Sequence, residues 1–150
     1  MREAIRLSRE SMRRGEGGPF GAVVVRGGEI VGRGRNRVTA RNDPTAHAEI
    51  EAIRQACRRL KTFHLDGCDL YASCEPCPMC LSAIYWGRLR MVCYANTRRD
   101  AAKIGFSDQL IYREVSLRIQ KRRIPMKQLL QAEALRVFEE WERKPDKVPY

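Results

Sequence analysis

The sequence has 150 residues, of which 43% are hydrophobic and 31% are charged, which suits one globular domain with a buried core. This composition excludes disordered, collagen-like and coiled-coil proteins, and no apolar stretch is long enough to cross a bilayer. The charged N-terminus lacks the apolar core of a secretory signal, so we expect a cytoplasmic protein whose six cysteines form no disulfide scaffold.

The formal net charge of +11 raises the question of an anionic partner. Basic residues recur in the first 14 residues and again between Arg113 and Lys127. They are typical either of a phosphate-binding face or of a solvated, arginine-rich surface. We favour the solvated surface, because no aromatic side chains interleave the basic ones, as they do in proteins that bind single-stranded nucleic acid.

The N-terminal third predicts a helix followed by a hairpin. Residues 1–14 have the pattern of an amphipathic helix with Ile5, Leu7 and Met12 facing inward. Residues 20–25 and 30–34 are then predicted as two strands. Gly27 and Gly28 between them suit a two-residue turn that needs positive φ.

The rest of the chain alternates between helices and strands. The remaining predicted elements are a helix from about 46 to 60, a strand at 68–73, a helix from Pro76 to Gly87, a strand at 91–95 and helices at 101–103, 108–121 and 128–143. This order predicts a three-layer α/β/α sandwich around a mixed central sheet.

Two short motifs carry the candidate chemistry: His47-Ala48-Glu49 and Pro76-Cys77-Pro78-Met79-Cys80. Cys77 and Cys80, three residues apart at a predicted helix start, share one face, and the helix N-terminus favours their thiolates. One imidazole and two thiolates suit Zn²⁺, and three protein ligands leave the open position of a catalytic site. Glu49 is then free to act as general acid and base, which is the signature of zinc deaminases.

A structural zinc site is the alternative. Cys74 lies three residues before Cys77 and would close the site as a fourth ligand. We favour the catalytic interpretation, because Cys74 is predicted at a strand end and Glu49 would otherwise have no reason to lie beside the metal.

The sequence resembles the bacterial guanine deaminases of the cytidine-deaminase-like superfamily over almost its whole length. The resemblance rests on Gly17–Val23, on Asn42–Glu49, on Tyr71–Cys80 and on Ala83–Trp86. These zinc motifs are shared with tRNA adenosine deaminases. The segment Ile104–Asp108, Ile111-Tyr112 and the terminal Tyr150 favour the guanine deaminases.

The resemblance implies a set of substrate contacts. Asn36 and Asp108 would hydrogen-bond the purine, Phe20 would pack on its ring, and Trp86 and Tyr150 would close the pocket. Backbone amides such as that of Ala48 would stabilise the developing charge. Without the resemblance, Asn36 is equally a turn residue, Asp108 a helix cap, Phe20 and Trp86 core residues and Tyr150 part of a frayed tail.

The resemblance also implies the function and the partners. We expect one zinc-dependent domain over residues 1–150 that converts guanine to xanthine and ammonia as a homodimer. In that family the C-terminal segment, about residues 128–150, crosses to the partner subunit. The alternatives are deamination of tRNA adenosine, of guanosine or of another heterocycle such as a triazine, and a non-catalytic RNA-binding zinc module.

Overall fold

A computed structural model describes residues 1–149 of the chain, which divides into two compact units. The first comprises Met1–Asp108 and the second begins at Gln109. Each unit is described by itself. No helix among the described residues is both long enough and apolar enough to cross a membrane.

The first unit is built on a four-stranded mixed sheet with the order β2-β1-β3-β4. Its strands are β1 (Gly21–Arg26), β2 (Glu29–Arg35), β3 (Cys68–Cys74) and β4 (Met91–Asn96). Strand β1 runs antiparallel to both β2 and β3, whereas β3 and β4 are parallel. The predicted mixed sheet is therefore confirmed.

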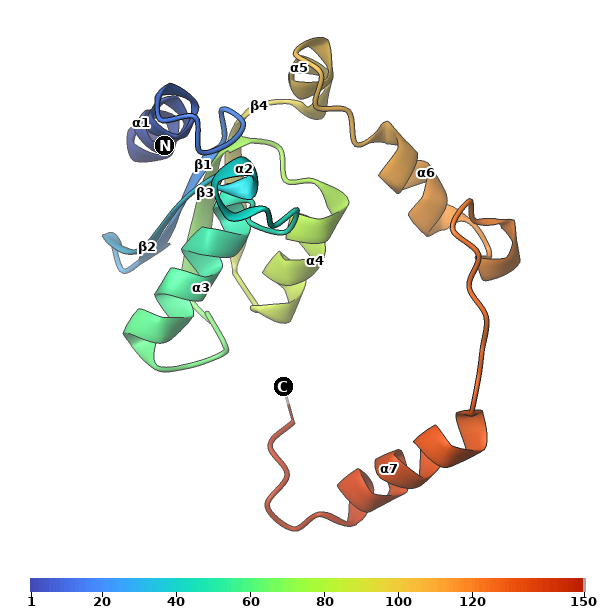
Figure 1. Cartoon of the computed structure of the whole chain (residues 1–150). Coiled ribbons are helices and arrows are strands. Elements are labelled where there is room, and N and C mark those ends of the chain that lie inside the picture. The colour runs from blue at the N-terminus through green and yellow to red at the C-terminus, as the bar shows by residue number, and fades with distance from the viewer. Residues whose placement is uncertain (150) are drawn as a thin grey trace. The chain divides into compact units, whose positions relative to one another are not determined.

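Helices cover both faces of this sheet (Figure 1), as the three-layer prediction requires. Alternate residues of a strand point to opposite faces. Ala22 and Val24 belong to the core cluster that includes α3 (Ala48–Leu60) and Ile84 of α4 (Pro78–Trp86). On the other face, Gly21 lies against α1 (Arg2–Arg13).

The inward face of α1 differs from the prediction. Ala4, Leu7 and Ser11 are buried, whereas Ile5 and Met12 are 40% and 54% exposed. Residues 4, 7 and 11 are three or four positions apart and form one stripe along the helix. Ile5 and Met12 each follow a buried residue by one position, which places them about 100° around the helix from that stripe. Prediction from apolar character alone therefore placed Ile5 and Met12 on the buried face, where Ala4 and Ser11 lie instead.

A close contact with β2 sets the position of α3. A Cβ atom added at Gly34 would lie 1.9 Å from the carbonyl oxygen of Ala48, and one at Gly32 would lie 2.3 Å from that of Ala52. Only glycine leaves room for the helix backbone at this distance. Because Ala48 is the first residue of α3, this contact also holds the N-terminus of the helix against β2.

The remaining helices are α2 (Val38–Arg41), α5 (Arg98–Lys103), α6 (Gln109–Ser116), the 3₁₀ helix η1 (Ile119–Lys121) and α7 (Gln131–Arg143). Of these, α2 was not predicted, α5 begins three residues earlier than predicted, and α6 and α7 are shorter than predicted. Helix α6 ends where the Ser116 hydroxyl donates to the carbonyl of Arg113, a side-chain bond that competes with the helix ladder. Leu130, with φ 52°, precedes α7 in a left-handed conformation that the prediction of a helix from 128 did not include.

Strand topology collects the predicted site residues at one end of the sheet. The start of β1 pairs with the ends of β2 and β3, since Gly21 lies opposite Arg35 and Ala22 opposite Ala72. The segments before β1, after β2 and after β3 therefore meet at that end. They contain Phe20, Asn36 and Cys77 respectively.

Candidate functional site

Two helix N-termini supply the candidate metal ligands. His47 is the N-cap of α3, Cys77 is the N-cap of α4, and Cys80 follows in the first turn of α4. Helix α4 begins at Pro78, and not at Pro76 as predicted, so Cys77 becomes the capping residue. Neither residue makes a side-chain capping hydrogen bond.

The distances among these side chains fit a tetrahedral zinc site. The ligand atoms of His47, Cys77 and Cys80 lie within 4.8 Å of one another. His47 Nδ1 is 3.6 Å from Cys77 Sγ and 3.5 Å from Cys80 Sγ. Zinc bonds of about 2.3 Å to sulfur and about 2.0 Å to nitrogen, at tetrahedral angles, separate the two atoms by about 3.5 Å. The geometry and the donor set therefore fit zinc.

Electrostatics at the triad favours a bound cation. A hydrogen bond from Cys80, together with His47, lowers the pKa of the Cys77 thiol to about 4. The hydrogen bond with Cys77 and burial raise the pKa of Cys80, and the hydrogen bond with Cys77 raises that of His47. One thiolate is thus already stabilised, and a dication in this place would displace the second thiol proton.

Glu49 lies beside the triad with its side chain directed into the protein. The residue is 7% exposed, in the first turn of α3. Burial raises the pKa of its carboxyl group, and the negative charge of Cys77 adds to the effect. The Cys80 thiol opposes this rise in the pKa of Glu49, and Glu49 in turn raises the pKa of Cys80. Such a carboxylate binds and releases protons more readily near neutral pH than a solvated one.

Cys74 does not belong to the triad. Its ligand atom is not among those that lie within 4.8 Å of one another in the described part of the chain. The Cys74 thiol instead lies 3.6 Å from the carbonyl oxygen of Thr97, to which it donates. Burial raises the pKa of Cys74 to about 11, which keeps this thiol protonated. These observations favour three protein ligands over the closed, four-ligand alternative.

We expect Cys74→Ser to retain one zinc per chain and to keep its turnover, because serine still offers a hydroxyl donor to Thr97. Cys77→Ser should lose zinc, since a hydroxyl is a poor ligand beside a thiolate. Zinc content measured by mass spectrometry on freshly purified protein distinguishes the two variants. Loss of zinc from Cys74→Ser would establish the four-ligand site.

Asn36 follows β2 and is 5% exposed. Its Oδ1 accepts hydrogen bonds from the backbone N–H groups of Gly18, at 3.3 Å, and Val38, at 3.2 Å. A Cβ at Gly17 would lie 2.0 Å from the same oxygen, so the loop closes tightly on the carboxamide. With the oxygen engaged, the amide NH₂ is the group that remains to bind a ligand. The bond to Val38 is that of a turn residue, and the contact of Asn36 with a substrate stays a prediction.

Ser11 holds Asn36 from the other side, a contact that the sequence analysis missed. The buried hydroxyl lies 2.6 Å from the carbonyl oxygen of Asn36 and 3.1 Å from that of Gly18. Its signal in the sequence was a small polar residue at the third position of the inward stripe of α1.

Replacing Ser11 by alanine should lower the free energy of unfolding by about 1 to 3 kcal/mol, because the buried carbonyl group of Asn36 and the part-buried one of Gly18 lose the single hydroxyl proton that lies between them. Urea unfolding monitored by circular dichroism measures the change. Ser8→Ala is the matched control on the same helix, since the Ser8 hydroxyl bonds only within α1, to Ile5; its effect should stay below about 0.5 kcal/mol. Equal effects would show that Ser11 contributes only through helix propensity.

Two aromatic rings lie beside Asn36. Phe20 contacts Phe106 edge to face, with ring centroids 5.0 Å apart. The Phe20 main chain accepts a hydrogen bond from the N–H of Asn36. Phe20 is partly buried and also packs against the core cluster, as its interpretation as a core residue requires. No role was predicted for Phe106 itself, although it is two residues from Asp108.

Asp108, the last residue of the first unit, is half-buried. Burial raises the pKa of its carboxyl group, and the charge of Cys77 raises it further. The cation of Arg98 acts in the opposite direction. The carboxyl group of Asp108 therefore interacts electrostatically with the candidate metal ligand Cys77.

The other predicted contacts have different outcomes. Ala48 is fully buried at the first position of α3, where its backbone N–H has no acceptor within the helix. Trp86 ends α4, at the opposite end of the helix from Cys77, and is 66% exposed, so its interpretation as a core residue is wrong. Tyr150 lies outside the described residues.

Comparison with known proteins gives matches over the full chain and matches over part of it. The chain is 49% identical to the guanine deaminase of Bacillus subtilis over 150 residues, which is all of this chain and 96% of that protein. The X-ray structure of a guanine deaminase from Bacillus subtilis superposes with a TM-score of 0.96 over 99% of this chain and 95% of that one.

Other relatives match a shorter part. The tRNA-specific adenosine deaminase of Aquifex aeolicus is 43% identical over 95 residues, 63% of this chain and 62% of that protein. Residues 1–96 match the cytidine and deoxycytidylate deaminase zinc-binding region. This match includes His47, Glu49, Cys77 and Cys80. The chain therefore belongs to the cytidine and deoxycytidylate deaminase zinc-binding family.

Proposed function

We propose that this protein is a zinc-dependent hydrolase that converts guanine and water to xanthine and ammonia. The observation that carries the proposal is the full-length match to a guanine deaminase. The tRNA adenosine deaminase match covers 63% of the chain. The guanine deaminase match also extends through residues 109–150.

In the proposed reaction His47, Cys77 and Cys80 hold the zinc. When bound, zinc supplies Lewis-acid activation of a water molecule. Glu49 would accept a proton from the attacking water as the water oxygen bonds to purine C2, and would deliver that proton to the ring nitrogen of the C=N bond that is lost. The proton of the new hydroxyl group would then pass through Glu49 to the amino nitrogen on C2, so that a C=O bond forms as the C2–N bond breaks and ammonia leaves. The buried position and raised pKa of Glu49 support this role.

The proposed substrate contacts follow from donors and acceptors. The NH₂ group of Asn36 would donate to an acceptor on the guanine ring, since its oxygen is already engaged. Asp108 would accept from the N–H groups of the base. Phe20 would pack against the ring, supported by Phe106. The backbone N–H of Ala48 would stabilise negative charge that develops during the reaction.

We propose in addition that the protein is a homodimer in which the C-terminal segment, about residues 128–150, crosses to the partner. Support comes from residues 109–149, none of which is buried. Leu135, Phe138 and Trp141 of α7 are 47%, 71% and 46% exposed. A helix with such an apolar face requires a surface to cover it. Trp86 and Tyr150 would close the pocket across this interface.

Cytoplasmic localisation is also a proposal, supported by the cysteines. All six are free thiols, and the neighbouring thiols of Cys77 and Cys80 must stay reduced to bind zinc.

Ammonia release from the zinc-loaded protein tests the proposed reaction. Guanine, guanosine, a triazine, adenine, cytidine and a tRNA anticodon stem-loop are offered in parallel. We expect turnover of guanine with xanthine as the product. Turnover of the stem-loop alone, with a salt-sensitive affinity, would replace guanine deamination by tRNA editing. RNA binding without any turnover would identify a non-catalytic module.

A further inference from the structure

An arginine-rich groove on the first unit lies outside the proposed deamination site. It has a volume of about 540 Å³. Six guanidinium groups line it, from α1, β2, the segment after β2, α2 and α3: Arg6, Arg33, Arg35, Arg37, Arg41 and Arg58. The candidate zinc ligands and Glu49 do not line it. The groove is therefore a separate feature of the surface.

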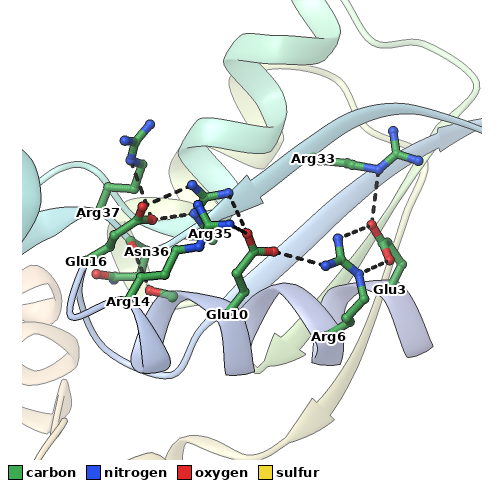
Figure 2. A network of polar contacts seen from close by, with 10 residues as sticks. Glu3, Arg6, Glu10, Arg14, Glu16, Arg33, Arg35, Asn36 and Arg37 are labelled. Carbon is green, nitrogen blue, oxygen red and sulfur yellow. Dashed lines mark hydrogen bonds and ion pairs between the residues drawn. The ribbon is translucent and has the colours of Figure 1, made fainter.

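The carboxylates around the groove do not neutralise it. Glu10 and Glu51 also line it, and Glu3 and Glu16 pair with its arginines from outside the lining, so six arginines face four carboxylates and leave two positive charges in excess. Figure 2 shows that the nearby carboxylates are shared between arginines. Glu10 pairs with Arg6, Arg14 and Arg35, and Glu16 lies against Arg35 and is 3.8 Å from Arg37.

Two of the arginines retain unused donors. Nε of Arg37 is buried and has no hydrogen-bond partner within the described part of the chain. The guanidinium of Arg58 forms no ion pair or hydrogen bond with any described residue. Buried donors are usually satisfied in native proteins, by water or by a ligand where the protein itself offers no acceptor. The buried Nε of Arg37 meets this condition, whereas Arg58 is exposed and contributes its unpaired positive charge. The unsatisfied donor and the excess charge both point to an anion.

The distribution of the arginines identifies the class of anion. Guanidinium forks match the oxygens of a phosphate group bidentately. A single phosphate reaches only a few of them, whereas these arginines come from α1, β2, the segment after β2, α2 and α3. No aromatic side chain among the described residues lines the groove, so none of them offers a stacking surface for a nucleobase. Recognition would therefore rest on a chain of phosphates and not on a base.

We propose that this groove binds an oligophosphate chain of two or three phosphates, either free or as part of a nucleotide. Its volume lies within the range of about 300 to 1,000 Å³ that is usual for small-molecule sites. Such a site gives a specific role to part of the basic surface. Binding there can be measured without turnover, so the proposal stands independently of guanine deamination.

Calorimetric titration of the zinc-loaded full chain with tripolyphosphate tests the proposal, with ATP in a second arm. We expect saturable binding of one ligand per chain, at least about tenfold weaker in an Arg37→Gln, Arg58→Gln double variant. Tighter binding of tripolyphosphate would indicate a free chain as the ligand, and tighter binding of ATP a nucleotide. Zinc content is measured afterwards to exclude extraction of the metal.

The matched control is Arg9→Gln, Arg13→Gln, which removes the same charge from the exposed side of α1 outside the groove. The control should bind tripolyphosphate as the unmodified protein does. Equal weakening in both double variants would attribute binding to net charge and overturn the proposal. Equal affinity for citrate at the same ionic strength, or binding of RNA alone, would also overturn it.

Discussion

Glu49→Ala is expected to retain zinc and to lose turnover of guanine by about 10³- to 10⁴-fold, the upper range for removal of a general acid and base. Zinc remains because its three proposed ligands are His47, Cys77 and Cys80, whose side chains the substitution does not alter. The buried Glu49 carboxylate is the group that would carry the proton. Steady-state ammonia release and zinc content are measured on the same preparation.

Two further variants separate charge from position. Glu49→Gln retains the size of the side chain but cannot accept the proton, so it should be as inactive as Glu49→Ala. Glu51→Gln removes a carboxylate from the same turn of α3, where it pairs with Arg41 and Arg54, and should keep its activity. Full activity of Glu49→Gln would remove the general base from the proposed mechanism.

A heterodimer of two inactive chains should recover about half of the activity of the unmodified dimer, if the C-terminal segment closes the partner's pocket. One chain carries Glu49→Ala and an intact C-terminus. The other lacks Val148–Tyr150 and retains Glu49. In a crossed dimer one of the two pockets then combines an intact Glu49 with an intact C-terminal segment, while the other pocket has both defects.

The two chains are co-expressed with different affinity tags, and the heterodimer is purified by both. Each homodimer, prepared in the same way, is the control and should be almost inactive. If each segment closes the pocket of its own subunit, both pockets of the heterodimer keep one defect, and no activity returns. A monomeric mass by light scattering would contradict the dimer itself.

Local spacing accounts for what could be predicted at the site. Cys77 and Cys80 are one helical turn apart, and this separation follows from helix geometry whatever the rest of the chain does. The same holds for the alternation of strands and helices, from which the mixed sheet and its two helical layers were predicted. Glu49 was identified because its distance from His47 along the chain is part of a known chemical pattern.

The errors also have local causes. The inward face of α1 was assigned from apolar character, although the buried stripe includes Ala4 and Ser11 and leaves Met12 exposed. Small residues lie inward there because the helix packs closely on the sheet, as Gly21 shows against Ala4. For Trp86 the core alternative is wrong, because hydrophobicity alone does not determine which face of a helix meets a neighbour, whereas its place at the pocket stays a prediction.

The sequence by itself determined the chemistry of the ligands, the order of the elements and the family. Only the tertiary structure brought His47 to within 3.6 Å of Cys77, engaged the oxygen of Asn36 and placed Phe106 against Phe20. It also gathered arginines from α1, β2 and α3 around one groove. The physical reason is that bonded geometry sets distances within a turn, whereas contacts between segments far apart in the chain depend on how the sheet and helices pack.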